Sequence, residues 1–260
     1  MASARVDYDA IADFYDDTPY RGKDPDAELL AFVAGRGASP ELAVLDVACG
    51  TGNQLVADHA ALSGARLVGI DRSAGMLAQA HRKEAGIAWV RADGAVLPFA
   101  AGRFDFVTCQ MAFHHFADKT GHLDEVFRVL KPGGRFVMTN LSPHDSPDWL
   151  YYRYFPEALT RDLDDFWAPD MITAEMLRLG FDRVAIERRH VRFRQDMRHW
   201  DDEVRRRGTC SQLLAIPDAA YEAGLQRLSA DLTAAGGPLL RDNHLCLVTI
   251  RGDKPPPLRS

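Results

Sequence analysis

Residues 44–53 read Val-Leu-Asp-Val-Ala-Cys-Gly-Thr-Gly-Asn. An apolar strand ends here in an acidic residue, Asp46, and the chain then turns through Gly50 and Gly52 before a helical pattern begins at about Gln54. A glycine turn between a strand and a helix is typical of the loops that bind nucleotide-type ligands in doubly wound α/β proteins. The stretch therefore predicts a strand–turn–helix unit of such a fold.

The charge of Asp46 indicates what kind of ligand this turn binds. A carboxylate at this point repels a pyrophosphate and attracts an ammonium or sulfonium group. S-adenosyl-L-methionine (SAM) carries both positive groups and no phosphate, so SAM is the predicted ligand. Asp46 is expected to hold its ammonium directly or through water, while Gly50 and Gly52 let the backbone approach the ligand closely. The competing interpretation is an ordinary strand-to-helix turn.

Strand and helix patterns alternate through the first 140 residues. The expected strands are residues 43–47, 66–70, 88–91, 104–109 and 135–140. The expected helices are residues 55–61, 75–83 and 120–130, the last ended by Lys-Pro-Gly-Gly at residues 131–134. This alternation predicts a parallel sheet with helices on both faces.

The pattern changes after residue 141. Residues 141–169 show no clean period, residues 195–235 are mostly helical and polar, and the remaining elements expected are a helix at 172–180 and strands at 183–193 and 244–251. We therefore predict four parts: an N-terminal helical lid (1–40), a SAM-binding Rossmann-like core (41–142), a C-terminal part with a helical substrate lobe and the last two strands (143–251), and a disordered tail (252–260).

Composition excludes several classes of protein. The chain has 260 residues, 47% of them apolar, and a net charge of −6, which argues against a nucleic-acid partner. Its four cysteines form no Cys-x-x-Cys pair, as expected for a protein of the reducing cytoplasm. There is no signal-peptide pattern and no apolar run of the roughly 20 residues that span a membrane. We expect a cytoplasmic monomer or homodimer.

Acidic residues follow the second and third expected strands as well. Asp71 ends the second strand and can accept both ribose hydroxyls of a nucleoside, cap the helix that begins near Ser73, or do both. Asp93 follows the third strand and can accept the adenine amino group, with the Gly94 backbone against the ring; the alternative is a solvated loop residue. Met76 can pack on adenine or be plain core.

The segment after the fourth strand, residues 109–116, is expected to line the cleft near the reactive sulfur. Gln110 can contact the ligand through its backbone. His114 and His115 are the candidate general bases, because an unperturbed His titrates at about 6.5. The alternative is that they only orient the loop. No third ligand stands at a spacing that predicts a metal site.

These segments together resemble the class I SAM-dependent methyltransferases, in the small-molecule group similar to the ubiquinone/menaquinone-biosynthesis (type 11) enzymes. The matching segments are V-L-D-V-A-C-G-T-G (44–52), V-G-I-D-R-S (68–73), A-D-G-A-V-L-P-F (92–99), F-D-F-V-T-C-Q-M-A-F-H-H-F (104–116) and E-V-F-R-V-L-K-P-G-G-R-F (125–136). The resemblance implies a Rossmann-like, doubly wound seven-stranded sheet whose last strand is antiparallel, with a helical insertion or lid.

The resemblance also assigns roles in the cofactor site. Asp46, Gly50 and Gly52 would hold the methionine part of SAM, Asp71 the ribose, and Asp93 with Gly94 the adenine. The remaining predicted cofactor contacts are Tyr15, Ala48, Arg72, Met76 and Gln110.

The N-terminal pattern Tyr8-Asp9-x-Ile11-Ala12-x-Phe14-Tyr15 resembles the family's helix that covers the cofactor. It makes Tyr8, Tyr15 and Tyr20 candidates for lid residues. An amphipathic helix packed on the core is the simpler interpretation, and both can hold.

The second half contains two further candidate features. An aromatic cluster can form an apolar acceptor pocket or simply the core of a small lobe: Tyr151, Tyr152, Tyr154, Phe155, Phe166 and Trp167. Residues 178–207 hold ten arginines. Most are expected on a solvated face, although one or two can clamp an acidic acceptor.

The predicted activity is in-line methyl transfer from SAM to an oxygen, nitrogen or carbon of a small-molecule acceptor, leaving S-adenosyl-L-homocysteine (SAH). An NAD-dependent oxidoreductase is disfavoured because Leu55 replaces the third glycine of Gly-x-Gly-x-x-Gly. A nucleic-acid methyltransferase is disfavoured because residues 109–112 lack Asn/Asp-Pro-Pro-Tyr. A SAM-binding protein without methyl transfer, or one using a carboxylated SAM, stays open.

Overall fold

The chain divides into two compact units. The computed structural model describes residues 7–17, 21–36 and 42–256. The core unit comprises Tyr8–Asn140, Pro169–Glu187 and Thr249–Ser260, and the helical unit comprises Met1–Asp7, Leu141–Ala168 and Arg188–Val248. The predicted lid residue Tyr20 and residues 257–260 of the predicted tail lie outside the described residues.

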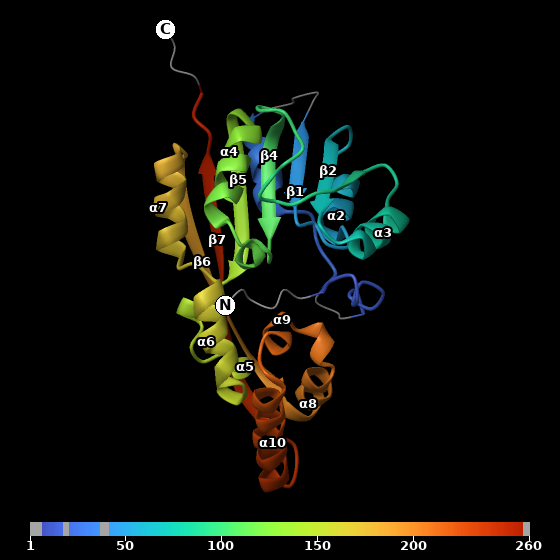
Figure 1. The fold of residues 1–260 in the computed structure, drawn as a ribbon, viewed down its shortest axis with the longest axis vertical. Helices are drawn as coiled ribbons and strands as arrows, with labels where there is room; N and C mark the ends of the chain where they lie inside the picture. The colour runs from blue at the N-terminus through green and yellow to red at the C-terminus, as the bar shows by residue number, and fades with distance from the viewer. Residues whose placement is uncertain (1–6, 18–20, 37–41, 257–260) are drawn as a thin grey trace. The chain divides into compact units, whose positions relative to one another are not determined.

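The core unit is built on a seven-stranded sheet in the order β3-β2-β1-β4-β5-β7-β6. The pairs β1–β2, β2–β3, β1–β4 and β4–β5 are parallel, and Figure 1 shows β2, β1, β4 and β5 side by side. Strand order reverses between β1 and β4, which is where ligands bind in doubly wound sheets. The strands are β1 (Ala43–Val47), β2 (Arg66–Asp71), β3 (Ala88–Arg91), β4 (Phe104–Gln110), β5 (Leu130–Leu141), β6 (Asp182–Asp196) and β7 (Leu240–Asp253).

The last strand runs antiparallel to β5. Gly133, near the start of β5, donates its N–H to the carbonyl of Lys254 at 2.7 Å. Thr139, near the end of β5, contacts Thr249 at 3.1 Å between hydroxyl oxygens. The start of β5 thus contacts the end of β7, and the end of β5 contacts an earlier part of β7, so the two strands are antiparallel. The predicted seven-stranded fold with an antiparallel last strand is confirmed.

Helices cover both faces of the sheet in the core unit. Val137 of β5 belongs to the hydrophobic cluster that holds Leu29 of α1 and Leu55 of α2. Its neighbour Phe136 points to the opposite face, because side chains alternate along a strand, and its ring lies 6.2 Å from that of His122 in α4. Among the described residues, the helices of this unit are α1 (Ala27–Arg36), α2 (Asn53–Ala61), α3 (Ala74–Lys83), η2 (Phe113–His115), α4 (Lys119–Val129) and α7 (Pro169–Leu179).

The helical unit contains two helices where the sequence shows no period. The segment around Pro156 forms α5 (Leu150–Tyr154) and α6 (Pro156–Asp165). Aromatic side chains are buried around the short α5, so no one-sided apolar stripe marks it in the sequence. The other helices here are η3 (Pro143–Asp145), α8 (Met197–Arg205), η4 (Arg207–Thr209), α9 (Ser211–Leu214) and α10 (Asp218–Ala235).

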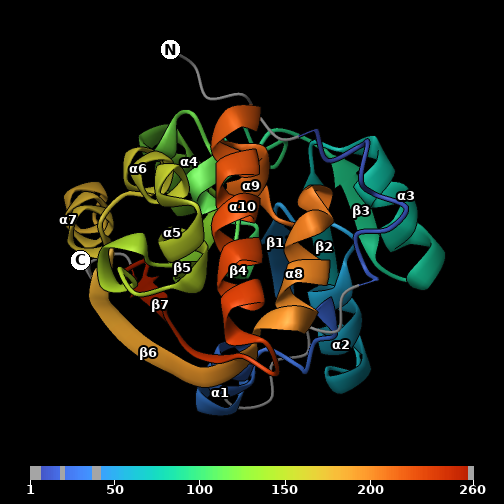
Figure 2. The same ribbon diagram turned by 90° about the horizontal axis from the view of Figure 1, so that it is seen from below.

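The aromatic cluster is the hydrophobic core of the helical unit. Five of its six predicted members are buried there, and Trp167 is half-buried outside it. Helix α10 packs against α5 and α8 (Figure 2). A Cβ at Gly224 of α10 would lie 2.1 Å from a ring carbon of Phe155, so this contact requires glycine. The lobe-core interpretation of the cluster therefore holds; an acceptor pocket within it stays a prediction.

Arginines of residues 178–207 make local ion pairs on the surface. Arg178 pairs with Glu175, Arg205 with Asp201, and Arg207 with Asp218. Exposed pairs of this kind contribute about 0–1 kcal/mol each. No helix in the described part of the chain has the length and apolar character needed to cross a membrane.

Candidate functional site

The glycine loop between β1 and α2 adopts left-handed backbone angles at three residues. The φ angles are 60° at Ala48, 55° at Gly50 and 77° at Gly52. A Cβ at Gly52 would lie 2.6 Å from the ring of Trp89, whereas a Cβ at Gly50 would meet nothing within 4 Å. Gly52 therefore serves packing, and the space beside Gly50 is open to a ligand.

Asp71 connects the end of β2 to this loop. Its Oδ2 accepts a hydrogen bond from the Gly50 N–H and its Oδ1 one from the Ser73 N–H, both at 2.9 Å. A carboxylate oxygen accepts two hydrogen bonds, so both can still take a ribose hydroxyl. The interpretation of Asp71 as the cap of α3 is wrong, because the N-cap is Ser73, whose hydroxyl accepts from the Met76 N–H. Burial raises the pKa of Asp71.

Asp46 is 3% exposed, and its Oδ1 has no hydrogen-bond partner among the described residues. Burial, followed by the negative charges of Asp58 and Asp26, raises its pKa well above the usual range. A buried carboxyl without a partner favours a cationic group beside it. The site therefore fits the ammonium of SAM.

The loop after β3 is held by a histidine that sequence patterns did not identify. His122 Nδ1 contacts the Gly94 carbonyl at 2.8 Å, and its ring stacks on Phe116 at 4.1 Å between centroids. A Cβ at Gly94 would lie 2.5 Å from the Phe116 ring, so glycine is required here by protein packing. Asp93 is exposed, and its Oδ1 accepts from the Ala95 N–H at 2.9 Å.

The segment after β4 contains both predicted histidines. His115 Nε2 lies 2.7 Å from the Tyr8 hydroxyl, and the amide of Asn140 donates to His114 Nδ1 at 3.2 Å. The two imidazole centroids are 3.9 Å apart. Burial lowers the pKa of His115 to about 4 and that of His114 well below its usual value, so both rings are neutral at pH 7.

The side chains of two predicted cofactor contacts, Gln110 and Met76, are engaged by the protein itself. The Gln110 side chain donates to Asp26 Oδ2 at 2.9 Å, which leaves its backbone as the predicted ligand contact. Met76 is 1% exposed and packs in the core. Contacts of Met76, Ala48 and Arg72 with the cofactor stay predictions.

Residues 8–16 form turns, not the expected regular helix, and lie along α3. Three aspartates attach this segment to α3 and to the residue before it. Later aspartates bind later residues of the helix, so the segment follows the helix along its length. Asp9 accepts from the Ser73 hydroxyl and the Gly75 N–H, Asp13 accepts from Gln79, and Asp16 accepts from Lys83 at 2.6 Å. These side-chain contacts attach the N-terminal segment to α3.

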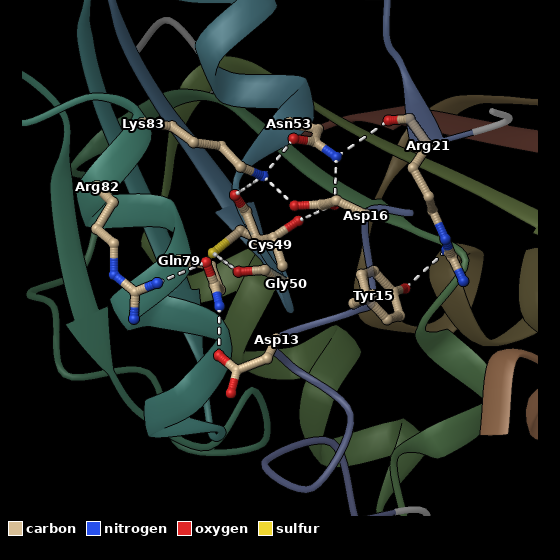
Figure 3. Close-up of polar contacts among 11 residues, drawn as sticks. Asp13, Tyr15, Asp16, Arg21, Cys49, Gly50, Asn53, Gln79, Arg82 and Lys83 are labelled. Atoms are coloured by element: carbon tan, nitrogen blue, oxygen red, sulfur yellow. Dashed lines mark hydrogen bonds and ion pairs between the residues drawn. The ribbon is translucent and has the colours of Figure 1, made fainter. Parts of the chain in front are cut away.

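Lys83 is the centre of this attachment (Figure 3). Besides Asp16, it donates to the Thr51 carbonyl at 2.8 Å and to the Asn53 side chain. Asp16 also accepts from the Thr51 hydroxyl and the Asn53 amide, both at 2.8 Å. Since Thr51 and Asn53 flank Gly52, the N-terminal segment is joined directly to the glycine loop. Nearby, Arg21 donates to the hydroxyl of the predicted lid residue Tyr15 at 2.7 Å.

Replacing Lys83 with alanine is expected to loosen residues 8–17. Partly exposed ion pairs contribute about 1 kcal/mol, so amide hydrogen exchange in this segment should rise about fivefold. Exchange measured by mass spectrometry checks this. His81→Ala is the matched control, because His81 lies on the exposed side of the same helix, α3. Equal exchange in Lys83→Ala and wild type would contradict the role of Lys83.

Part of the chain matches a known family and known relatives. A family model described as a methyltransferase domain matches residues 45–138. The demethylmenaquinone methyltransferase of Thermus thermophilus is 33% identical over 165 residues, which covers 53% of this chain and 73% of that protein. The ubiquinone/menaquinone biosynthesis C-methyltransferase UbiE of Desulfotalea psychrophila is 36% identical over 140 residues, covering 52% of this chain and 57% of that protein. The chain thus spans little more than half the length of UbiE.

Solved structures share the fold at low sequence identity. A putative methyltransferase from an antibiotic biosynthesis pathway of Anabaena variabilis has a TM-score of 0.64 at 17% identity, over 95% of this chain and 99% of that chain. The YcgJ protein of Bacillus subtilis has a TM-score of 0.59 at 20% identity, over 87% and 97%. At these identities the likeness shows the fold alone.

The sheet order, the glycine loop and the acidic strand ends define a SAM-binding α/β protein. The chain belongs to the class I SAM-dependent methyltransferases, in the group of the ubiquinone/menaquinone-biosynthesis enzymes. This membership confirms the predicted family and enzyme class, with SAM as the cofactor and a small molecule as the acceptor. The role of each site residue stays a prediction.

Proposed function

We propose that this enzyme methylates a carbon of a small hydroxylated ring, such as a quinol, at the carboxyl edge of β3, β2, β1 and β4. One observation carries the cofactor half of the proposal. These four strands are parallel neighbours, so Asp93, Asp71, Asp46 and Gln110 follow one another along the same edge. Two relatives are named a demethylmenaquinone methyltransferase and a ubiquinone/menaquinone biosynthesis C-methyltransferase, and these names favour a quinol acceptor.

SAM supplies a methyl group on a positively charged sulfur, which is already a good leaving group. The protein therefore needs mainly to align the reactants and exclude water, which lowers a barrier by about 7–11 kcal/mol in well-oriented systems. Asp71 would fix the ribose and Asp46 the amino group, and the segment after β4 would face the acceptor. Residues 8–17 would exclude water, because they bind the glycine loop, α3 and His115.

His115 and Tyr8 are the proposed acid–base pair. A ring carbon becomes nucleophilic when the neighbouring hydroxyl loses its proton. Burial raises the pKa of Tyr8, so its hydroxyl stays protonated and can donate to neutral His115. Tyr8 can then pass its proton to His115 Nε2 while it accepts one from the acceptor. His114, held by Asn140, is the second candidate base.

Substituting His115 with alanine is expected to lower kcat about 100-fold or more, because positioned acid–base groups contribute about 10²–10⁴. SAM affinity should change less than threefold. His114→Ala tests the second candidate, and His81→Ala, on the exposed side of α3, is the control. Unchanged kcat in both His114→Ala and His115→Ala would remove these residues from the mechanism.

The pH profile supplies an independent readout of the same group. Because the pKa of His115 is lowered to about 4, its proton-accepting form persists as pH falls from 7 and is lost only near pH 4. The acid limb of kcat should therefore lie near pH 4 in wild type and disappear in His115→Ala. A limb at about 6.5, the value of an ordinary His, would contradict a buried base.

The function is tested by incubating the protein with methyl-labelled SAM and matched acceptor panels of quinols, phenols, amines and carboxylates. Label transfer to a quinol ring carbon supports the proposal, and transfer to a heteroatom would replace the acceptor class. SAM binding without transfer to any panel would favour a protein that binds the cofactor for another purpose. We expect the protein to be cytoplasmic, which cell fractionation tests. We expect it to be a monomer or a homodimer, which light scattering tests.

A further inference from the structure

Three buried oxygen atoms near the end of β1 lack hydrogen-bond partners among the described residues. They are Asp46 Oδ1, Thr108 Oγ1 and Asp58 Oδ2. Asp46 and Thr108 are register partners on the adjacent parallel strands β1 and β4, so their side chains emerge on the same face of the sheet. All three residues are at most 3% exposed. Buried polar atoms are normally satisfied, so three on neighbouring elements indicate a missing polar group.

Asp58 reaches this place from α2. The cluster that holds Leu55 of α2 also holds Val44, which precedes Asp46 by two residues and shares its face. The face of the sheet that carries Asp46 is therefore the one that α2 covers. The remaining oxygen of Asp58, Oδ1, accepts from the Gln54 side chain at 3.1 Å.

A second chain of contacts links Asp58 to β4. Asp58 Oδ1 also accepts from the Asp26 N–H at 2.7 Å. Asp26 Oδ2 in turn accepts from Gln110, which lies two residues after Thr108 on the same side of β4. Hydrogen bonds therefore join α2 to β4 through Asp26. Asp46 Oδ1, Thr108 Oγ1 and Asp58 Oδ2 take no part in these bonds.

The charge of Asp58 acts on the carboxyl group of Asp46. Burial raises the pKa of Asp58 to about 6, and its negative charge is among the causes that raise the pKa of Asp46. Buried carboxyls whose charges repel do not both ionise freely, so we expect the pair to keep a proton in the free protein. The other charged groups that act on the pair are Asp26, Asp71 and Lys23, and the charge of Asp46 in turn raises the pKa of the Cys49 and Cys109 thiols.

An ammonium group has the chemistry that these atoms require. It carries one positive charge and three N–H donors, and the site offers two carboxyl oxygens and one hydroxyl oxygen as acceptors. The amino-acid portion of SAM carries such a group, and the predicted position of that portion is beside the glycine loop that follows Asp46. Binding of the cation would favour the ionised form of both carboxyls.

We propose that Asp58 and Asp46, with the Thr108 hydroxyl, form a two-carboxyl site for the α-ammonium of SAM, and that the pair releases a proton when the ammonium binds. The proposal rests on SAM as the cofactor and is independent of the acceptor. It makes Asp58, which no sequence pattern identified, a determinant of selectivity for the amino-acid portion of the cofactor.

The test is calorimetric titration of the full-length protein with SAH and with 5′-methylthioadenosine, which has the adenosine but lacks the amino-acid portion. Titration in two buffers of different ionisation enthalpy gives the protons released per ligand bound. Wild type should release a proton with SAH and none with methylthioadenosine between pH 6 and 7. Its SAH affinity should rise with pH, because the carboxyl proton must leave before the ammonium binds.

Asp58→Asn keeps the shape of the side chain and removes its charge. It should weaken SAH binding 10- to 100-fold, leave methylthioadenosine binding within threefold, and reduce the proton release; Asp124→Asn, exposed on α4, is the control. Equal loss for both ligands, or normal SAH binding with normal proton release, would overturn the proposal. If Asp58→Asn does not fold, the number of protons that wild type releases with each ligand tests the proposal. Failure of wild type to bind either ligand would instead refute SAM as the cofactor.

Discussion

Replacing Asp71 with alanine is expected to weaken SAM and SAH binding about 100-fold or more. The Asp71 carboxylate would accept one hydrogen bond from each of the two ribose hydroxyls. Hydrogen bonds to a charged group contribute about 1.5–3 kcal/mol each. The substitution also removes the acceptor for the Gly50 and Ser73 N–H groups, which loosens the glycine loop. Calorimetric titration of the purified variant measures the loss.

Two controls separate ligand binding from folding in this experiment. Asp71→Asn keeps the size of the side chain and should lose less affinity than Asp71→Ala. Asp124→Ala, on the exposed side of α4, should bind SAM as wild type does. If folded Asp71→Ala binds SAM within threefold of wild type, the ribose lies elsewhere and the site described here is wrong.

Substituting Gly52 with alanine is expected to cause the largest loss of stability of any change in the glycine loop. Its φ of 77° is left-handed, which costs a non-glycine residue about 1–2 kcal/mol, and the new Cβ would lie 2.6 Å from Trp89, where overpacking adds about 1–3 kcal/mol. The free energy of unfolding should therefore fall by about 2–5 kcal/mol. Denaturant titration measures it.

Two other glycines provide matched comparisons for Gly52→Ala. Gly50 and Gly102 have φ of 55° and 66°, and a Cβ on either meets nothing within 4 Å. Gly50→Ala and Gly102→Ala should each lose only about 1–2 kcal/mol. Of these two, only Gly50→Ala should weaken SAM binding, because its Cβ enters the space open to the ligand. Equal unfolding free energies for Gly52→Ala and Gly102→Ala would show that Trp89 does not restrict the loop.

The strand ends of the site were predictable because their signal is local. Residues 44–53 carry the strand, the acidic residue and the glycine turn in one continuous run, and Asp71 and Asp93 stand at the ends of the next two strands. Parallel pairing then places them along one edge whatever the later sequence does. The lengths of the outer strands were less predictable: β5 begins at Leu130 and includes the Pro-Gly-Gly turn signal.

The residues that sequence analysis missed act through long-range contacts. His122 supports the Gly94 carbonyl, Lys83 binds Asp16 across 67 residues, and Asp58 meets Asp26 across 32. Each looks like an ordinary residue of an amphipathic helix, since periodicity reports which side of a helix is buried and not what a polar side chain contacts. The only available signal was Asp58 itself, a charge at a position that the helix buries.

The most direct test of the central claim is calorimetric titration of the wild-type protein with SAM, SAH and NAD. We predict that SAM and SAH bind and that NAD does not, because Asp46 lies where a pyrophosphate would have to approach the glycine loop. Binding of NAD without binding of SAM or SAH would contradict the assignment of Asp46 and of the cofactor site built around it.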